Sequence, residues 1–200
     1  MRTHFAGRSA TTAAMALILF IFSACTGSSA ATSPQDQPKF KEFEDRLGKY
    51  MQTHKKAAGT IPSIPKETAD AALIVKHQQQ LAAAIAALRP NALVGEVFSP
   101  PVRQLFIETI KQKTEGKEGA AARATILGEG NPKSAESQTD VKLSVNGTYP
   151  TTAPLSTVPP SILMALPSLP KELQYRFVGR NLILLDTEAN LIVDFIPNVV

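Results

Sequence analysis

The sequence predicts an α+β fold, in which a three-helix region packs on a small C-terminal antiparallel β-meander. In the first half of the chain after the leader, apolar residues recur at steps of three and four, as on one face of a helix. Residues 174–196 instead form three short segments rich in Leu, Ile, Val, Tyr and Phe, separated by turn residues. Helices first and strands last are typical of an α+β domain.

The first predicted helix has an apolar stripe, with Lys and Glu on its other side. Gly59 and Pro62 close this helix. The stripe comprises Phe40, Phe43, Leu47, Tyr50, Met51 and His54.

Two further helices are expected before residue 114. Residues 66–89 are rich in alanine, the strongest helix former, and Pro90 ends them. The shared face of this second helix comprises Leu73, His77, Leu81, Ala84, Ile85 and Leu88. Ser99 is placed as an N-cap, with Pro100 at the first helical position of the third helix. Short connections between the three helices favour a compact, hairpin-like bundle.

The segment 114–139 is rich in Lys, Glu, Gly, Ala and Ser, and we expect an exposed helix over 118–127 followed by loop. Residues 141–145 alternate in polarity, which predicts a strand. The proline-dense stretch that follows permits only a short helical turn at 161–165.

The three C-terminal strands are expected at 174–178, 181–186 and 191–196. Gly179-Arg180 suits a two-residue turn with glycine at the first central position. The middle strand is apolar on both faces, so it must be covered on both sides, which places the helices over the sheet.

The N-terminus has the pattern of an export signal. Arg2 and Arg8 precede an uninterrupted apolar run over 13–22, which is too short for the roughly 20 residues of a membrane-spanning helix. Small residues follow the run at once. We therefore expect residues 1–24 to be a signal peptide.

Phe22-Ser23-Ala24-Cys25 resembles the lipobox of bacterial lipoproteins, in which signal peptidase II cuts before a diacylated cysteine. Leucine is usual where this chain has Phe22. The resemblance implies lipidation of Cys25, the only cysteine in the sequence. Since no aspartate follows Cys25, the enterobacterial sorting rule favours the outer membrane. The alternative is a plain secretory signal, cut after Ala24, Ala30 or Ala31.

The lipidation hypothesis divides the chain into three parts. Residues 25–38 are small, polar and proline-containing, as in a flexible tether. Residues 39–200 then form a single α+β domain, with a helical part at 39–113, an exposed helix and loop at 114–139, and the strand, proline-rich loop and meander at 140–200. A family of uncharacterised secreted bacterial proteins is similar in its closing segment to residues 175–186 and 188–197, and also in the segments 50–55, 77–88 and 154–160. That resemblance implies one domain in an exported protein and transfers no catalytic residue.

The charge pattern argues against nucleic acid as a partner. Without Arg2 and Arg8, 19 basic residues face 17 acidic ones, and the two signs interleave. Nucleotide-binding glycine loops and the nucleophile elbow of hydrolases are also missing, so no cofactor is expected.

Two histidines are candidate site residues. His54 and His77 both fall on apolar helix faces, and antiparallel packing of the first two helices would bring them together. Imidazole is a common metal ligand, but no third ligand stands at a recognised spacing. A hydrogen-bonded, partly buried histidine is the simpler interpretation, and we predict no metal.

Three carboxylates surround the final hairpin: Asp186, Glu188 and Asp194. Paired carboxylates can act as general acid and base when their surroundings separate their pKa values. Solvated turn residues, or partners for Arg176 and Arg180, are the simpler interpretation.

Two hypotheses about function follow. In the first, the chain is an exported, lipid-anchored, non-catalytic protein of the cell envelope, on the periplasmic face of a membrane. It binds an envelope partner through the proline-rich segment or an exposed strand edge, or it serves as a structural module of the envelope. In the second, it is an envelope enzyme that uses His54, His77, Asp186 and Asp194. A pocket that gathers two of these within hydrogen-bond reach favours the enzyme, whereas their burial in salt bridges favours the binding module.

Overall fold

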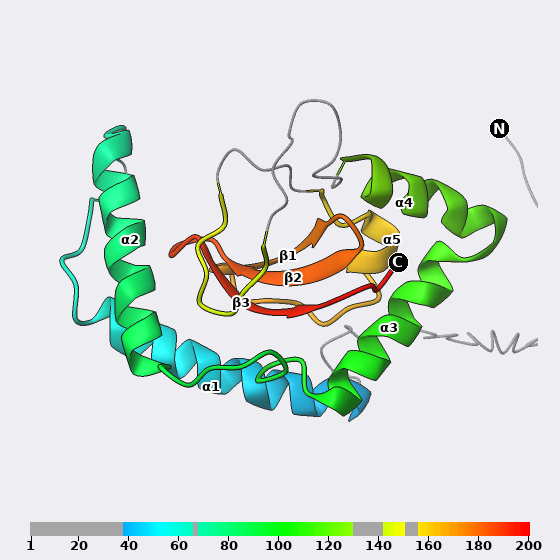
Figure 1. Ribbon diagram of the computed structural model, residues 1–200, viewed down its shortest axis with the longest axis horizontal. Coiled ribbons are helices and arrows are strands. Elements are labelled where there is room, and N and C mark those ends of the chain that lie inside the picture. Colours follow the sequence, from blue (N-terminus) through cyan, green and yellow to red (C-terminus); the bar gives the residue numbers. More distant parts are fainter. Residues whose placement is uncertain (1–37, 66–67, 130–141, 151–155) are drawn as a thin grey trace, which may run out of the picture. The chain divides into compact units, whose positions relative to one another are not determined.

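A three-stranded antiparallel sheet follows the helices, so the chain has the predicted α+β fold (Figure 1). The computed structural model describes residues 38–65, 68–129, 142–150 and 156–200. The predicted signal peptide, Cys25 and the tether up to residue 37 lie outside these residues. The described residues all belong to one compact unit.

The sheet has the order β1-β2-β3, with β1 at Leu173–Val178, β2 at Asn181–Asp186 and β3 at Leu191–Ile196. All three predicted strands are confirmed, and β1 begins one residue earlier than expected. Gly179 has a φ of 57°, so it stands at the first central position of the β1–β2 turn as predicted.

A β-bulge interrupts the pairing of β2 with β3. Leu184 pairs with Asp194 and Leu185 with Ile192, which leaves Val193 as the extra residue. Bulges re-aim side chains. Here Val193 joins the core under the helices, and Asp194 also points to that side, where it contacts residues 95–98.

Helices cover one face of the sheet, and an irregular segment covers the other. The helix-facing core includes Phe177, Leu184 and Val193. On the opposite face, Leu143 and Tyr149 pack against Ile183 and neighbouring strand residues. Both faces of β2 are therefore buried, as predicted, but the helices supply only one of the two covers.

The helices spread around the sheet in place of the predicted bundle. Figure 1 shows α1 (Lys41–Ala58) passing beside the sheet, with α2 (Ala71–Leu88) at one end and α3 (Pro100–Thr114) with α4 (Gly116–Glu129) at the other. The segment between α2 and α3 lies along α1, where Arg46 donates to the carbonyl of Glu96 at 2.8 Å. This segment separates α3 from α2, which explains why no bundle forms.

The starts of α2 and α3 each differ from the prediction in one respect, and side-chain hydrogen bonds explain both differences. The carboxylate of Asp70 accepts from the amides of Ala72 and Leu73, so α2 begins at residue 71, later than the expected 66. α3 begins at Pro100 as predicted. Ser99, however, does not cap it with its side chain, because its Oγ donates to Glu42 at 2.7 Å.

The middle of the chain is partly as expected. α4 includes the predicted helix at 118–127, but Ile126 is buried, so the helix is not wholly exposed. The predicted strand at 141–145 is wrong for the described residues 142–145, which lead into a turn at Val145-Asn146; residue 141 lies outside the described part. A bridge of Thr148 with Leu191, together with backbone hydrogen bonds between residues 146–149 and 190–192, joins this segment to β3. A 3-10 turn (Pro38–Phe40) precedes α1, and α5 (Pro160–Leu163) is the short helix of the proline-rich stretch.

Candidate functional site

The structure brings together three of the predicted site residues. His54 lies on α1, Asp186 ends β2, and Glu188 lies in the turn that follows. The ring nitrogens of His54 contact both carboxylates, at 2.7 Å for Nδ1 to Asp186 and 3.2 Å for Nε2 to Glu188. Asp194 and His77 belong to two other places in the fold.

Helical spacing adds a fourth residue, Tyr50. Residues four apart on a helix are neighbours on one face, so Tyr50 and His54 both reach the end of β2. The Tyr50 hydroxyl donates to Oδ2 of Asp186 at 2.6 Å, the same oxygen that meets His54. The other oxygen of Asp186 accepts from the amide of Ala189 at 2.9 Å. Both oxygens of this fully buried carboxylate are therefore used inside the protein.

Proton affinities in this cluster follow from the contacts. The hydrogen bond to Asp186 raises the pKa of His54 above 6.5, helped by the charges of Asp186 and Glu188 and opposed by burial. An imidazole whose two nitrogens both face carboxylates is satisfied as a cation, because each nitrogen then donates. Burial, together with the Asp186 charge, raises the pKa of Tyr50 far above 10.0, so its hydroxyl keeps its proton.

Arg89 is a buried residue beside this cluster that the sequence did not reveal. Its guanidinium lies 5.0 Å from the centre of the Tyr50 ring and donates to Glu96 at 2.7 Å. Only 7 % of Arg89 is exposed. The sequence offers no signal for this, because an arginine just after a helix is usually a solvated residue. Tyr50, in contrast, could have been found from its four-residue spacing to His54.

Asp194 is buried in a nest of backbone amides. Its carboxylate accepts from the amides of Gly95, Val97, Phe98 and Phe195, at 2.8 to 3.2 Å. Gly95 has a φ of 94°, a conformation that glycine adopts without strain, and its amide reaches both carboxylate oxygens. The carboxylate thus orders the segment that leads into α3.

The simpler interpretation of the C-terminal carboxylates is therefore wrong for two of them. Asp186 and Asp194 are fully buried rather than solvated, and neither pairs with Arg176 or Arg180 in the described structure. The reason is that β2 and β3 carry them into the core beneath α1 and residues 95–98. Glu188, whose side chain is 49 % exposed, fits the turn interpretation better.

His77 does not join His54 in a shared site. It lines an open hollow of about 410 Å³ together with Gln78, Thr187 and Glu188, and its Nδ1 has no hydrogen-bond partner in the described part of the chain. Among the residues that the structure describes, no group of three His, Cys, Asp or Glu side chains is arranged to hold a metal ion.

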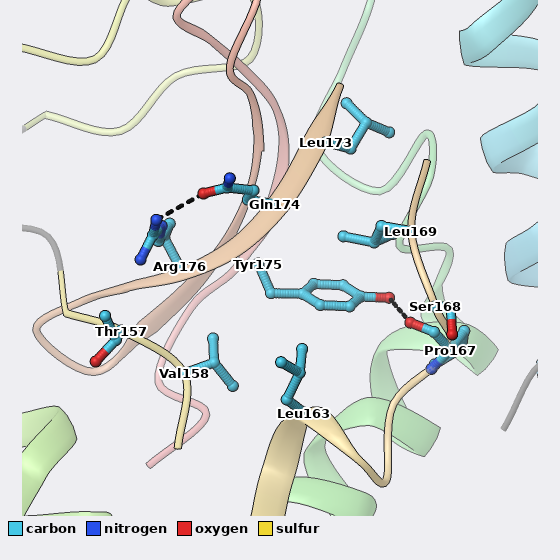
Figure 2. A pocket seen from close by; sticks show the side chains of 10 residues that line it. All are labelled: Thr157, Val158, Leu163, Pro167, Ser168, Leu169, Leu173, Gln174, Tyr175 and Arg176. Atoms are coloured by element: carbon cyan, nitrogen blue, oxygen red, sulfur yellow. Dashed lines mark hydrogen bonds between the residues drawn. The ribbon is translucent and has the colours of Figure 1, made fainter. Parts of the chain in front are cut away.

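The outer edge of β1 lines a hollow of about 520 Å³ (Figure 2). Leu163, Leu169 and Val158 supply apolar walls, and Arg176 lies at its border. The Tyr175 hydroxyl donates to the carbonyl of Pro167 at 3.2 Å, which ties the strand to the loop after α5. We call this hollow the edge groove. It lies between β1 and the proline-rich stretch that contains α5.

No helix in the described part of the chain has the length and apolarity needed to cross a membrane. Comparisons of the chain with models of protein families, with curated proteins and with solved structures give no match. The resemblances to a lipobox and to a family of secreted proteins therefore stay predictions.

Proposed function

We propose that the chain is an exported binding module of the bacterial cell envelope. In this proposal a lipid on Cys25 anchors it to the periplasmic face of a membrane, with the outer membrane favoured, and it performs no catalysis. Its partners are the membrane, through that lipid, and an envelope protein. Nucleic acid is not a partner.

The closed hydrogen-bond network around Asp186 carries the non-catalytic part of the proposal. A general base needs a free nitrogen or oxygen within reach of a substrate proton. His54 is only 5 % exposed, and both its nitrogens already face carboxylates. The network therefore resembles a structural ion pair between α1 and the end of β2.

A second candidate function rests on one specific feature. Glu188 contacts Nε2 of His54 and also lines the 410 Å³ hollow that contains His77. If Glu188 swung away, Nε2 would face this hollow, with Asp186 orienting the ring as in hydrolytic enzymes. This arrangement supports the alternative of an envelope enzyme.

Chemical modification separates the two candidates. Diethyl pyrocarbonate acylates neutral, accessible imidazole, so the binding module predicts that His54 reacts far more slowly than a histidine in an unfolded control peptide. Residue-resolved mass spectrometry gives the rate, and Glu188→Ala is the matched variant that opens the Nε2 side. Modification of native His54 at the rate of the peptide would favour the enzyme.

Anchoring is tested in cells that export the protein. Wild-type chain should incorporate labelled palmitate and sediment with membranes, whereas Cys25→Ser should do neither, because the acyl chains supply the membrane affinity. Ser23→Ala is a matched control that keeps the cysteine. Unchanged sedimentation of Cys25→Ser would overturn lipid anchoring.

A further inference from the structure

The outer edge of β1 has backbone hydrogen-bond partners along only part of its length in the described residues. Val178 and Asn181 flank the two-residue turn and form a hydrogen-bonded pair. Along β1 the backbone N–H and C=O groups therefore point alternately to β2 and to the outer edge. The outward residues are Leu173, Tyr175 and Phe177. Phe177 bonds Ser156 through both groups, and the amide of Leu173 bonds the carbonyl of Pro170.

Tyr175 lies between these two occupied positions. Within the described residues, no backbone hydrogen bond reaches its N–H or C=O from the outer side. The neighbouring segment leaves the edge after Ser156 and turns into α5 at Pro159-Pro160, so it does not continue as a fourth strand. Tyr175 as a whole is only 4 % exposed, but it lines the hollow, and unpaired N–H and C=O groups at a sheet edge are a template for another strand.

The edge groove lies beside this free position. Figure 2 shows Tyr175 on the side of β1 where Val158, Leu163 and Leu169 gather, and Gln174 with Arg176 on the other side. Leu163 is 52 % exposed, an unusual position for a large apolar side chain on a short helix. The apolar wall therefore borders the side of the strand on which Tyr175 lies.

Arg176 supplies the charge of the edge groove. Its guanidinium donates to Gln174 at 2.6 Å, its Nε is buried without a partner, and none of the described carboxylates pairs with it. The groove lining contains no acidic residue. An arginine left in this state favours a carboxylate from outside, because such a pair forms a charge-assisted hydrogen bond.

We propose that the edge groove binds an extended peptide of an envelope protein, which adds to β1 as a short fourth strand. The residue opposite Tyr175 exchanges both backbone hydrogen bonds with it and places an apolar side chain against Val158, Leu163 and Leu169. Because neighbouring residues of a strand point to opposite faces, the next residue lies on the side of Arg176 and is Asp or Glu. This inference rests on the proposed binding function and gives it a site and a partner chemistry.

A synthetic peptide tests the proposal directly. The probe is fluorescein-labelled Thr-Glu-Val-Glu-Thr with an amidated end, titrated with the full chain purified from the envelope. Fluorescence anisotropy should rise to saturation, and hydrogen exchange should slow at the amide of Tyr175, because the amides of Leu173 and Phe177 already have backbone partners. Glutamine in place of both glutamates should weaken binding about tenfold, and N-methylation of the valine should abolish it, because the donor to the Tyr175 carbonyl is lost.

Matched variants locate the site. Leu163→Asp should abolish binding, whereas Met164→Asp should not, since Met164 is 76 % exposed but does not line the groove. Arg176→Gln should remove the preference for glutamate over glutamine, and Arg180→Gln, at the exposed turn, should keep it. Leu163 is 52 % exposed and Arg176 is only partly buried, so neither substitution removes a core side chain and the fold should persist.

Three results with the purified chain, and one in cells, would overturn the proposal. The first is the absence of saturable binding, and the second is equal binding of the N-methylated peptide. The third is self-association of the chain, seen by light scattering and lost in Leu163→Asp, which would make a second copy the occupant. If photo-cross-linking in cells captures an envelope protein only from surfaces outside the groove, the groove fails while the proposed function stands. If no surface captures a protein, the binding function fails as well.

Discussion

At the scale of single residues, Asp186 joins two parts of the fold that are far apart in sequence. It ends β2, yet it accepts hydrogen bonds from Tyr50 and His54 of α1. Removing one member of a buried charged pair leaves the other charge without compensation. The carboxylate therefore matters more to stability than its position beside a turn suggests.

Asp186→Ala should lower the free energy of unfolding by about 3–5 kcal/mol, because it leaves the buried Tyr50 hydroxyl and His54 Nδ1 without their hydrogen-bond acceptor. Urea denaturation followed by circular dichroism measures this change. Glu188→Gln is the control, and it should cost at most about 1 kcal/mol, since the Glu188 side chain is 49 % exposed. Similar losses in the two variants would contradict the assigned role of Asp186.

The pKa of His54 predicts how stability depends on pH. Since its folded pKa is raised above 6.5, the charged form contributes stability that is fully present below pH 6.5. That contribution is lost as pH rises through the folded pKa. The groups that face the ring are Asp186 and Glu188, with Tyr50 and Arg89 nearby.

Thermal unfolding at a series of pH values measures this effect. The difference in unfolding free energy between wild type and His54→Gln should be largest below pH 6.5 and should shrink at alkaline pH. His77→Gln is the matched control and should leave the profile of the wild type. A difference between wild type and His54→Gln that grows with pH would refute the assignment.

Residue-level prediction from the sequence was uneven. The apolar stripe of α1 identified His54 as a partly buried, hydrogen-bonded histidine, which is what its contacts to Asp186 and Glu188 show. The buried state of Asp186 and Asp194 was missed, because an acidic residue at a strand end or beside a turn is usually solvated. Only the long-range contact with α1 or with residues 95–98 buries them.

At the scale of elements, the bulge in β3 and the segment before α3 depend on each other. The bulge places Asp194 on the helix side, where the amides of residues 95–98 surround it. Phe98 of that segment stacks with Phe43 of α1, at 5.7 Å between ring centres. Asp194 thereby supports an aromatic contact between residues 95–98 and α1.

Asp194→Ala should destabilise the fold by several kcal/mol, because each buried amide left without an acceptor costs about 1–3 kcal/mol. Hydrogen exchange should accelerate first at residues 95–98. Asp194→Asn, which retains one acceptor oxygen, should lie between wild type and alanine. Wild-type exchange at 95–98 in Asp194→Ala would show that the carboxylate does not order this segment.

Element boundaries were predictable where local chemistry sets them. Pro100 begins α3 and Gly179 makes the β1–β2 turn, each through its own backbone preference. Gly59 follows the end of α1 as expected, but its φ of −69° is open to any residue. The spread of the helices was not predictable. It depends on residues 89–99 packing along α1, and no local pattern encodes that contact.

At the scale of the whole molecule, we propose that residues 25–38 form a tether between a lipid anchor and the folded domain. Deleting residues 26–37 while keeping Cys25 should leave the melting temperature within about 1 °C of the wild type, because small polar linkers contribute little packing. Differential scanning calorimetry gives the comparison. A large fall in the melting temperature would show that this stretch packs on the domain.

The chemical state of Cys25 tests the proposed anchoring most directly, and mass spectrometry of the chain isolated from the membrane and cytosolic fractions determines it. We predict a mature N-terminus at Cys25 whose mass includes a diacylglyceryl group. A chain that begins at Met1, with an unmodified thiol and in the cytosolic fraction, would contradict the proposal.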